Sequence, residues 1–433
     1  MAGAAVVESG TYDLEIDTGY LWDAFVLDDT VKGVLDNTEY VLTGTTQYAS
    51  VIDGTVSLQT MRGRKDIGDQ FTFGTMTFVL NDTLADGIFN PFDTTSPYYD
   101  PNNNQPGLAP LRRVRLSRYN SLGVKKYLFV GYIVNYDYSF VLGGTNYITV
   151  FCADDFYLLA QTFLAANNPT EELSSTRIST ILSLPEVGYP TGPTHRNIQT
   201  GTVTLGGSAA YDIADGTSAA TYINEINRAE QGRVFISREG VFTFEPRLGN
   251  TLAGSVADFH DDGTAIPYQG VDISFQADQV KNRASVTHAG STTAQVAEDL
   301  ASQAIYLIQT ISIDNSLVHN DAEALSLAEY LIVGDPEARL NYLETQLPAM
   351  TVAQRDTVSI VDIGDTITIQ KSIITSTGSY QLAQESSVEG VEMIIDVNTG
   401  ARYTFYTAPT TIVYELILDS ETRGTIDTDN VLG

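Results

Sequence analysis

The 433-residue chain offers few side chains whose spacing could support catalysis or metal binding. Its histidines are His195, His260, His288 and His319, and no two share the spacing of ligands on one helix or hairpin. The densest metal candidate is the segment 258–263 (DFHDDG). It lacks the ligand order of a calcium loop, so a solvated turn is the favoured interpretation. No HExxH, CxxC, GxSxG or phosphate-loop motif occurs, and we expect no catalytic residue, no metal and no cofactor.

Other features argue against a reactive thiol, a glycosidase, a membrane protein and a secreted protein. Cys152 is the only cysteine, and it alternates with Ile148 and Val150 on a strand pattern, which favours a buried, unreactive thiol. With 54 acidic residues, pairs of carboxylates arise by chance and identify no glycosidase. No apolar run approaches the roughly 18–20 residues of a membrane span, and we expect no signal peptide.

Charge is unevenly distributed along this acidic chain, whose net charge is −31. Residues 62–126 hold nine basic and six acidic residues, whereas residues 127–433 hold thirteen basic and thirty-eight acidic ones. A solvated strand face is one explanation, and contact with the acidic surface of a neighbouring copy is the other. The acidity disfavours stable nucleic-acid binding but suits a channel through which DNA slides. The nine basic residues, called here the basic island, are Arg62, Arg64, Lys65, Arg112, Arg113, Arg115, Arg118, Lys125 and Lys126.

The elements that must position these side chains are mostly strands. Thr, Val, Ile and Tyr are frequent, and alternation places Met76, Phe78 and Leu80 on one strand face. Hairpins are predicted around the turns at 238–240 and 398–400. Helices are predicted at 156–165, after a cap at Asp154 or Asp155; from Ser174 or Ser175 to Pro185; from Thr217 or Ser218 to Gly232; and from Asn320 to Gly334, with Leu325, Ala328, Leu331 and Ile332 on the buried face.

A long aromatic loop rich in proline and asparagine connects two of the predicted strands. Its aromatic residues are Phe89, Phe92, Tyr98 and Tyr99. Packing within the loop and contact between subunits are both open interpretations, since tyrosine and phenylalanine are favoured in interfaces. Together with the basic island, this loop supplies the residues that we predict at a subunit interface: Arg62, Arg64, Phe89, Phe92, Tyr98, Tyr99, Arg112, Arg113 and Arg115.

The order of these segments resembles the minor tail proteins of long-tailed bacteriophages, the tail-tip (baseplate) hub family best represented among actinobacterial phages. The matching pieces are DGIFNPFD at 86–93, SPYY at 96–99, RVRL at 113–116, LFVGY at 128–132, QGRVFI at 231–236, VFTFEPR at 241–247 and IGDTITI at 363–369. Each piece alone is weakly specific for the family, but the fixed order of the pieces is more specific. The resemblance covers about residues 50–410, and residues 1–40 and 411–433 show no match.

The resemblance implies a mainly β fold with inserted helices (α+β), in which two barrel-like β domains flank a smaller helix-containing domain. The domains expected from this are an N-terminal arm (1–40), a first barrel-like domain (41–155), a helix-plus-hairpin middle domain (156–260), a second barrel-like domain (261–410) with an inserted helix at 320–334, and a C-terminal segment (411–433). The internal duplication is not visible as a sequence repeat, so it rests on the resemblance.

The resemblance also implies a non-enzymatic structural component of a phage tail tip, which closes the tail tube and organises the tip for host attachment and DNA ejection. The expected partners are further copies in a ring, most simply a homotrimer, the tail tube or distal tail protein, the tape-measure protein and other tail-tip proteins. The expected location is the virion tail tip, after assembly in the host cytoplasm. The competing hypothesis is a carbohydrate- or receptor-binding β-rich surface protein. A cell-wall-cleaving enzyme is disfavoured by the missing catalytic residues.

Overall fold

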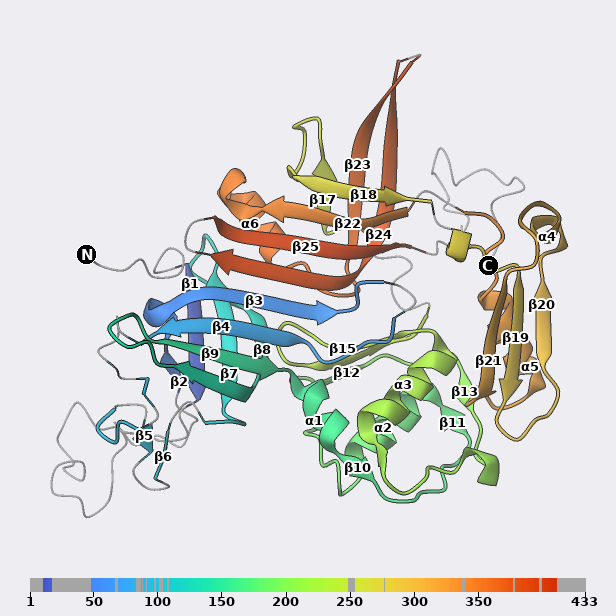
Figure 1. The fold of residues 1–433 in the computed structure, drawn as a ribbon. Coiled ribbons are helices and arrows are strands. Elements are labelled where there is room, and N and C mark those ends of the chain that lie inside the picture. The colour runs from blue at the N-terminus through green and yellow to red at the C-terminus, as the bar shows by residue number, and fades with distance from the viewer. Residues whose placement is uncertain are drawn as a thin grey trace.

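The computed structural model describes residues 11–17, 48–66, 69–82, 87, 89–90, 92–96, 99–100, 104–106, 109–247, 254–275, 277–336, 339–376, 378–396 and 399–410. The described chain is mainly β, as predicted, and most strands belong to one 13-stranded sheet (Figure 1). Its strands are β1 (Tyr12–Asp17), β2 (Tyr48–Ser50), β3 (Thr55–Gly63), β4 (Thr75–Asn81), β7 (Arg113–Tyr119), β8 (Lys125–Ser139), β9 (Tyr147–Ala153), β17 (Ala257–His260), β18 (Gly270–Ser274), β22 (Arg339–Gln346), β23 (Thr366–Thr375), β24 (Gly378–Asp396) and β25 (Gly400–Pro409).

The large sheet joins strands from the two ends of the described chain. Its strand order is β18-β22-β25-β24-β3-β4-β9-β8-β7-β1-β2. Strand β23 also pairs with β24, outside this order, and β17 pairs with β23. The seam is the antiparallel pair β3–β24, which runs from Gly63↔Gly390 to Ser57↔Asp396. Because the end strands β18 and β2 do not pair, the described strands form no closed barrel. The two predicted β regions are thus parts of one sheet, and their separation into two barrels is not confirmed.

Alternating side chains give the large sheet its core. Met76, Phe78 and Leu80 are buried on one face of β4, as their spacing predicts. Phe405 of β25 and Phe259 of β17 pack tilted, with ring centroids 6.0 Å apart. Both ends of the chain therefore contribute to one apolar cluster. The smaller elements around it are the 3₁₀ helices η1 (Ile52–Gly54), η3 (Ala277–Gln279) and η4 (Leu347–Ala349), helix α6 (Val352–Ser359) and the ribbon β5 (Tyr99–Asp100) with β6 (Gln105–Pro106).

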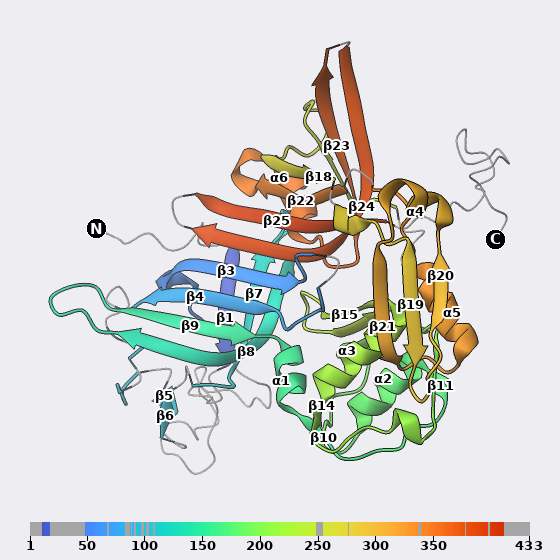
Figure 2. The ribbon, with the colours of Figure 1, turned by 45° about the vertical axis from the view of Figure 1, so that its right-hand side comes forward.

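A second core lies under the helices that Figures 1 and 2 show beside the large sheet, and it combines residues from 156–244 and 284–328. The predicted domain boundaries themselves remain predictions. The elements in this layer are α1 (Asp155–Gln161), β10 (Phe163–Leu164), β11 (Glu172–Leu173), α2 (Ser174–Ser183), β12 (Arg196–Ile198), β13 (Thr204–Leu205), η2 (Ala209–Tyr211), β14 (Thr217–Ser218), α3 (Ala219–Glu230), β15 (Arg233–Ile236), β16 (Phe242–Glu245), β19 (Arg283–His288), β20 (Gln295–Glu298), α4 (Leu300–Tyr306), β21 (Thr310–Ser316) and α5 (Asp321–Tyr330). None of the described helices has the length and apolar character needed to cross a membrane.

Helix caps were predicted well at three of four starts. The carboxylate of Asp154 accepts the Phe156 N–H at α1, and the Ser218 hydroxyl accepts the Thr221 N–H at α3. The Asn320 side chain accepts two N–H groups at α5. The predicted cap of α2 is wrong: Leu173 is its N-cap residue. The Ser174 hydroxyl instead donates to Glu230 over 2.6 Å, so a tertiary contact has taken the side chain that could have capped the helix.

Helix ends and buried faces differ more from prediction. Helix α1 ends at Gln161 rather than at 165, and Phe163, which the predicted helix would have included, is an exposed residue of β10. At the end of α3 the left-handed conformation falls on Gln231, one residue before the expected glycine. Helix α5 ends at Tyr330 rather than Gly334, and Leu325, predicted to be buried, is exposed. The buried face of α5 consists of Ala324, Leu327 and Ala328, and the helix packs against β19 and β20.

Candidate assembly site

The basic island is divided by the fold into two groups. Arg62 and Arg64 lie on or just after β3, whereas Arg113, Arg115 and Arg118 lie on β7. Strands β4, β9 and β8 separate β3 from β7 in the sheet. The two groups are therefore separated in sheet order, although Arg62 and Arg118 both pair with acids of the segment 356–362.

Many basic-island side chains pair with carboxylates of the same chain. These pairs are Arg62–Asp362 at 2.5 Å, Arg64–Glu389 at 2.8 Å, Lys65–Glu392 at 3.7 Å, Arg115–Glu15 at 2.7 Å, Arg118–Asp356 at 2.7 Å, and Lys125 with Asp13 at 3.0 Å and Glu15 at 2.7 Å. Most of these acids lie about 100 to 330 positions away in the sequence. The complementary acidic surface that the sequence suggested on a neighbour is supplied for these residues from within the chain.

Glu389 is the centre of a buried ionic group, here called the seam network. Its carboxylate accepts from Arg64 Nε at 2.9 Å and from Arg233 Nε at 3.0 Å. Arg233 also donates to Ser387 Oγ at 2.6 Å and contacts Glu245 at 3.4 Å. The residue just after β3, the hairpin β15–β16 and strand β24 each supply a member, so the network fastens three distant segments to one another.

A local irregularity of β24 directs Glu389 into this network. The pairing of β24 with β25 shifts register between Val388 and Gly390, which leaves Glu389 as the extra residue of a bulge. Two glycines permit the close backbone approach at the seam. A Cβ on Gly63 would lie 2.2 Å from the Glu389 carbonyl oxygen, and one on Gly390 would lie 2.3 Å from the Arg64 carbonyl oxygen.

Burial and charge act in opposite directions on the carboxylates of the seam network. Burial alone would raise the pKa of Glu389, but the guanidinium groups of Arg233 and Arg64 outweigh it and lower that pKa. For Glu245 burial is the larger effect and raises the pKa, although Arg233 opposes it. The charged form of Glu389 is thus the one that the fold stabilises.

A second ionic group lies beside the first. Asp362 accepts from Arg62 Nη1 at 2.5 Å and from the backbone N–H of Arg238 at 2.9 Å. Asp154 is buried near Arg62, and burial raises its pKa to about 8, although the N–H groups of Gly74 and Phe156 oppose the rise. The two groups together connect the large sheet, the β15–β16 hairpin and the start of helix α1. Their chemistry is that of structural ion pairs.

The residues predicted at a subunit interface fall into different environments. Phe89 is buried in the main core, so its ring serves packing within the chain, which was the competing interpretation. Arg62 is buried with its acid partner, whereas Phe92 is 79% exposed. Tyr99 hydrogen-bonds Asn104. Tyr98 lies outside the described residues.

The three arginines around β7 lie at the surface of the sheet. Arg112 and Arg113 are half-buried, and the Arg113 guanidinium lies 5.6 Å from the ring centroid of Tyr132. The Arg115 guanidinium lies 3.4 Å from the ring centroid of Tyr48, besides its pair with Glu15. These contacts are cation–π interactions on one strand face. A subunit contact through this face stays a prediction.

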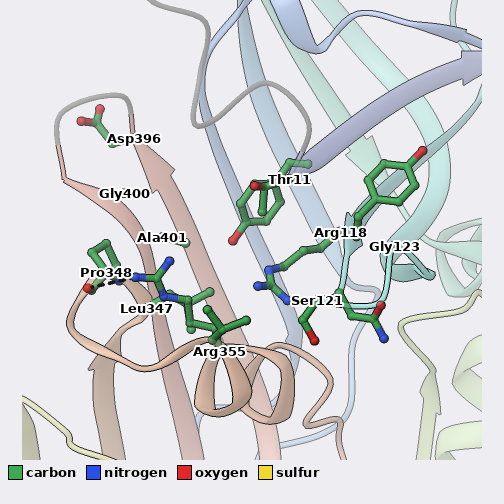
Figure 3. A pocket seen from close by; sticks show the side chains of 14 residues that line it. Thr11, Arg118, Ser121, Gly123, Leu347, Pro348, Arg355, Asp396, Gly400 and Ala401 are labelled. Atoms are coloured by element: carbon green, nitrogen blue, oxygen red, sulfur yellow. Dashed lines mark hydrogen bonds between the residues drawn. The ribbon is translucent and has the colours of Figure 1, made fainter.

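A cavity of about 770 Å³ opens between the start of β1, the β7–β8 turn and α6. Figure 3 shows Arg118 and Arg355 in its lining, with the Arg355 guanidinium turned toward Pro348. Arg355 donates to the carbonyl oxygens of Met350 and Pro348, at 3.1 and 3.3 Å. The described lining includes no histidine or cysteine, so the Ser121 hydroxyl in it has no histidine base beside it.

Neither candidate for metal or thiol chemistry gains support from the geometry. Among the described residues, no three His, Cys, Asp or Glu side chains are grouped as metal ligands. In the turn at 258–263, Asp261 accepts from Lys371 at 2.5 Å and from Ser372, and Asp262 accepts from Thr264. Cys152 is buried, as predicted, and burial raises the pKa of its thiol.

Sequence reasoning missed the residues that organise the ionic groups. Glu389, Arg233 and Glu245 were not singled out, because the sequence around a charged residue does not reveal which distant residue it pairs with. One signal was present: the pair Glu389-Gly390 interrupts the alternation of a long strand, and a glycine there often marks a bulge.

The fold has counterparts among solved structures, although no family model and no curated protein sequence matches the chain. A tail protein from Neisseria meningitidis MC58 superposes with a TM-score of 0.55 at 11% identity, over 85% of this chain and 96% of that protein. The 43 kDa tail protein of prophage MuSo2 from Shewanella oneidensis gives 0.54 at 11% identity, over 84% and 97%. The chain therefore has the fold of these bacterial and prophage tail proteins.

Proposed function

We propose that this protein is a structural component of a bacteriophage tail, and that it forms the hub of the tail tip. The observation that carries the proposal is the shared fold, which extends over 85% of this chain and almost the whole of the Neisseria tail protein. A likeness over nearly the full length of both chains supports a shared architectural role more than a single borrowed domain would. The order of sequence segments, which resembles that of hub proteins of actinobacterial phages, also supports the proposal.

In this role the protein closes the tail tube as a ring, most simply a homotrimer, in which each copy contributes two β regions. The tube or distal tail protein, the tape-measure protein and other tip proteins are its partners. Assembly in the host cytoplasm places it at the virion tail tip. There it organises host attachment and DNA ejection.

The proposed role needs rigidity rather than catalysis. Ionic groups join three distant segments at the seam, and the described cavity lacks histidine and cysteine. We therefore propose that the protein is not an enzyme. The net charge of −31 supports an acidic bore, because acidic walls stay hydrated and repel DNA phosphates during passage.

The test is to purify the full chain, measure its mass by sedimentation velocity and image it by negative-stain electron microscopy. We expect ring-shaped particles with three times the mass of one chain. Antibodies raised against the protein should label one end of the virion tail. A ring of six copies would refute the two-regions argument, and label on the tail sheath or capsid would refute the tip location. A monomer that binds glycans on an array would support the competing receptor-binding hypothesis.

A further inference from the structure

Two exposed apolar surfaces lie toward opposite sides of the subunit (Figures 1 and 2). One is the tip of the β8–β9 hairpin, called here the hairpin tip, where Phe140, Val141 and Leu142 are all exposed. The other, called here the helix ridge, consists of Leu300, Ile305, Leu307 and Ile308 on α4 and the turn after it. Isolated exposed apolar residues are ordinary, but clusters of three and four large ones mark interaction surfaces.

The helix ridge is held in place by a buried polar side chain. Asn282 is fully buried, and its amide donates to the Leu307 carbonyl oxygen at 2.7 Å and to Ser302 Oγ at 3.1 Å. Its side-chain oxygen accepts the Gln309 N–H at 2.8 Å. The turn that displays Leu307 and Ile308 is therefore fixed from inside rather than loosely attached.

The same turn contains a strained residue. Leu307 has φ 61° and ψ 178°, a region of backbone space that is essentially restricted to glycine. Its side chain is also 74% exposed. An isolated subunit gains nothing from a strained backbone that displays a leucine to water. Such strain persists where the surroundings impose it, and it is concentrated at functional contacts.

Charge identifies the occupant. Residues 138–153 and 300–313 contain no Asp, Glu, Lys or Arg, although the chain carries a net charge of −31. Two copies repel each other through most of their surfaces and can approach best where charge is absent. A basic partner would instead be drawn to acidic surface. Uncharged apolar surfaces therefore fit a second copy of this chain.

We propose that the hairpin tip of one copy packs on the helix ridge of the next. Because the two surfaces differ and face opposite sides, the contact is heterologous, and its repetition gives a ring when the rotation between neighbours closes. This inference rests on the self-association proposed above, to which it adds the residues in contact.

Cysteine pairing tests the contact directly. The variants Leu142→Cys and Ile305→Cys each add one exposed thiol, while the native Cys152 is buried and serves as background. Under mild oxidation, a mixture of the two variants should give disulfide-linked dimers that neither variant gives alone. The double variant should give linked species up to the full ring. Equal cross-linking in the single variants, or none in the mixture, would overturn the proposal.

A second variant separates association from folding. Glycine adopts the Leu307 conformation without strain, so Leu307→Gly should keep or raise the melting temperature of the monomer. It should weaken self-association at least tenfold. Leu122→Ser, at an exposed residue of the β7–β8 turn outside both surfaces, is the matched control and should associate like the wild type.

The outcomes also separate this inference from the proposed function. If the wild type forms trimeric rings while the cysteine mixture gives no linked dimer and Leu307→Gly associates normally, the contact is wrong and the hub proposal stands. If the wild type stays monomeric at every concentration, both are refuted.

Discussion

Replacing Glu389 with glutamine should destabilise the fold severely, because it removes the shared partner of two arginines. The side chain of Glu389 is 4% exposed, and those of Arg64 and Arg233 are 15% and 20% exposed. Loss of one member of a buried pair typically costs about 3–5 kcal/mol, since the remaining charge is left uncompensated. Arg233 keeps Ser387 and Glu245 as partners, so we expect a loss of about 3 kcal/mol in the free energy of unfolding.

The assay is urea unfolding at pH 7, followed by far-UV circular dichroism. Glu298→Gln is the matched control, because the side chains of Glu298 and Arg283 are 39% and 41% exposed and such surface pairs contribute about 1 kcal/mol or less. If Glu389→Gln loses no more stability than Glu298→Gln, the view of the seam network as a fastening of three segments is refuted.

The pH dependence gives an independent test of the same residue. The pKa of Glu389 is lowered in the fold from its ordinary 4.5, so its stabilisation is present above pH 4.5 and is lost as pH falls through the folded-state pKa. Glutamine does not titrate. The stability difference between wild type and Glu389→Gln should therefore be constant near neutral pH and shrink in acid below pH 4.5. A difference that grows in acid would contradict the assigned sign.

Three further substitutions test the described packing. Leu327→Ala on α5 should cost about 2–5 kcal/mol in urea unfolding, whereas the exposed Leu325→Ala should cost less than about 1 kcal/mol; equal losses would mean the helix is rotated. Asn282→Ala should cost about 1–3 kcal/mol because it removes a buried amide that bonds the Leu307 carbonyl and the Gln309 N–H, and near-neutral stability would show that the turn does not depend on these bonds. Gly63→Ala should lower the melting temperature far more than Gly123→Ala. Both glycines have a positive φ, of 82° and 72°, but an added Cβ would meet the Glu389 backbone at Gly63 and only open space at Gly123.

Local features of this fold could be predicted from sequence because they depend on neighbours along the chain. The alternation of Met76, Phe78 and Leu80 fixed the buried face of β4, and Asp154, Ser218 and Asn320 were recognised as caps. Each of these signals lies within a few residues of the structure it determines.

Features that depend on distant partners could not be predicted. The face of α5 was misassigned because Leu325 and Leu327 both suit a helix, and only β19 and β20 decide which is covered. Arg62 and Arg64 were seen as candidates for a partner's acids, but Asp362 and Glu389 lie about 300 positions further on. Local pattern carries no information about which strand of a sheet pairs with which.

The β3–β24 seam has a consequence for how the protein is made. Strand β3 emerges early in synthesis, and its partner β24 is more than 300 residues behind it. Ribosomes add roughly 5–20 residues per second, so the β3 edge waits tens of seconds with its backbone N–H and C=O groups open to other chains. Such long-range pairing folds slowly and is prone to misassociation. The early half of the chain should therefore aggregate when expressed alone, and ribosome-associated chaperones should increase the yield of the full chain.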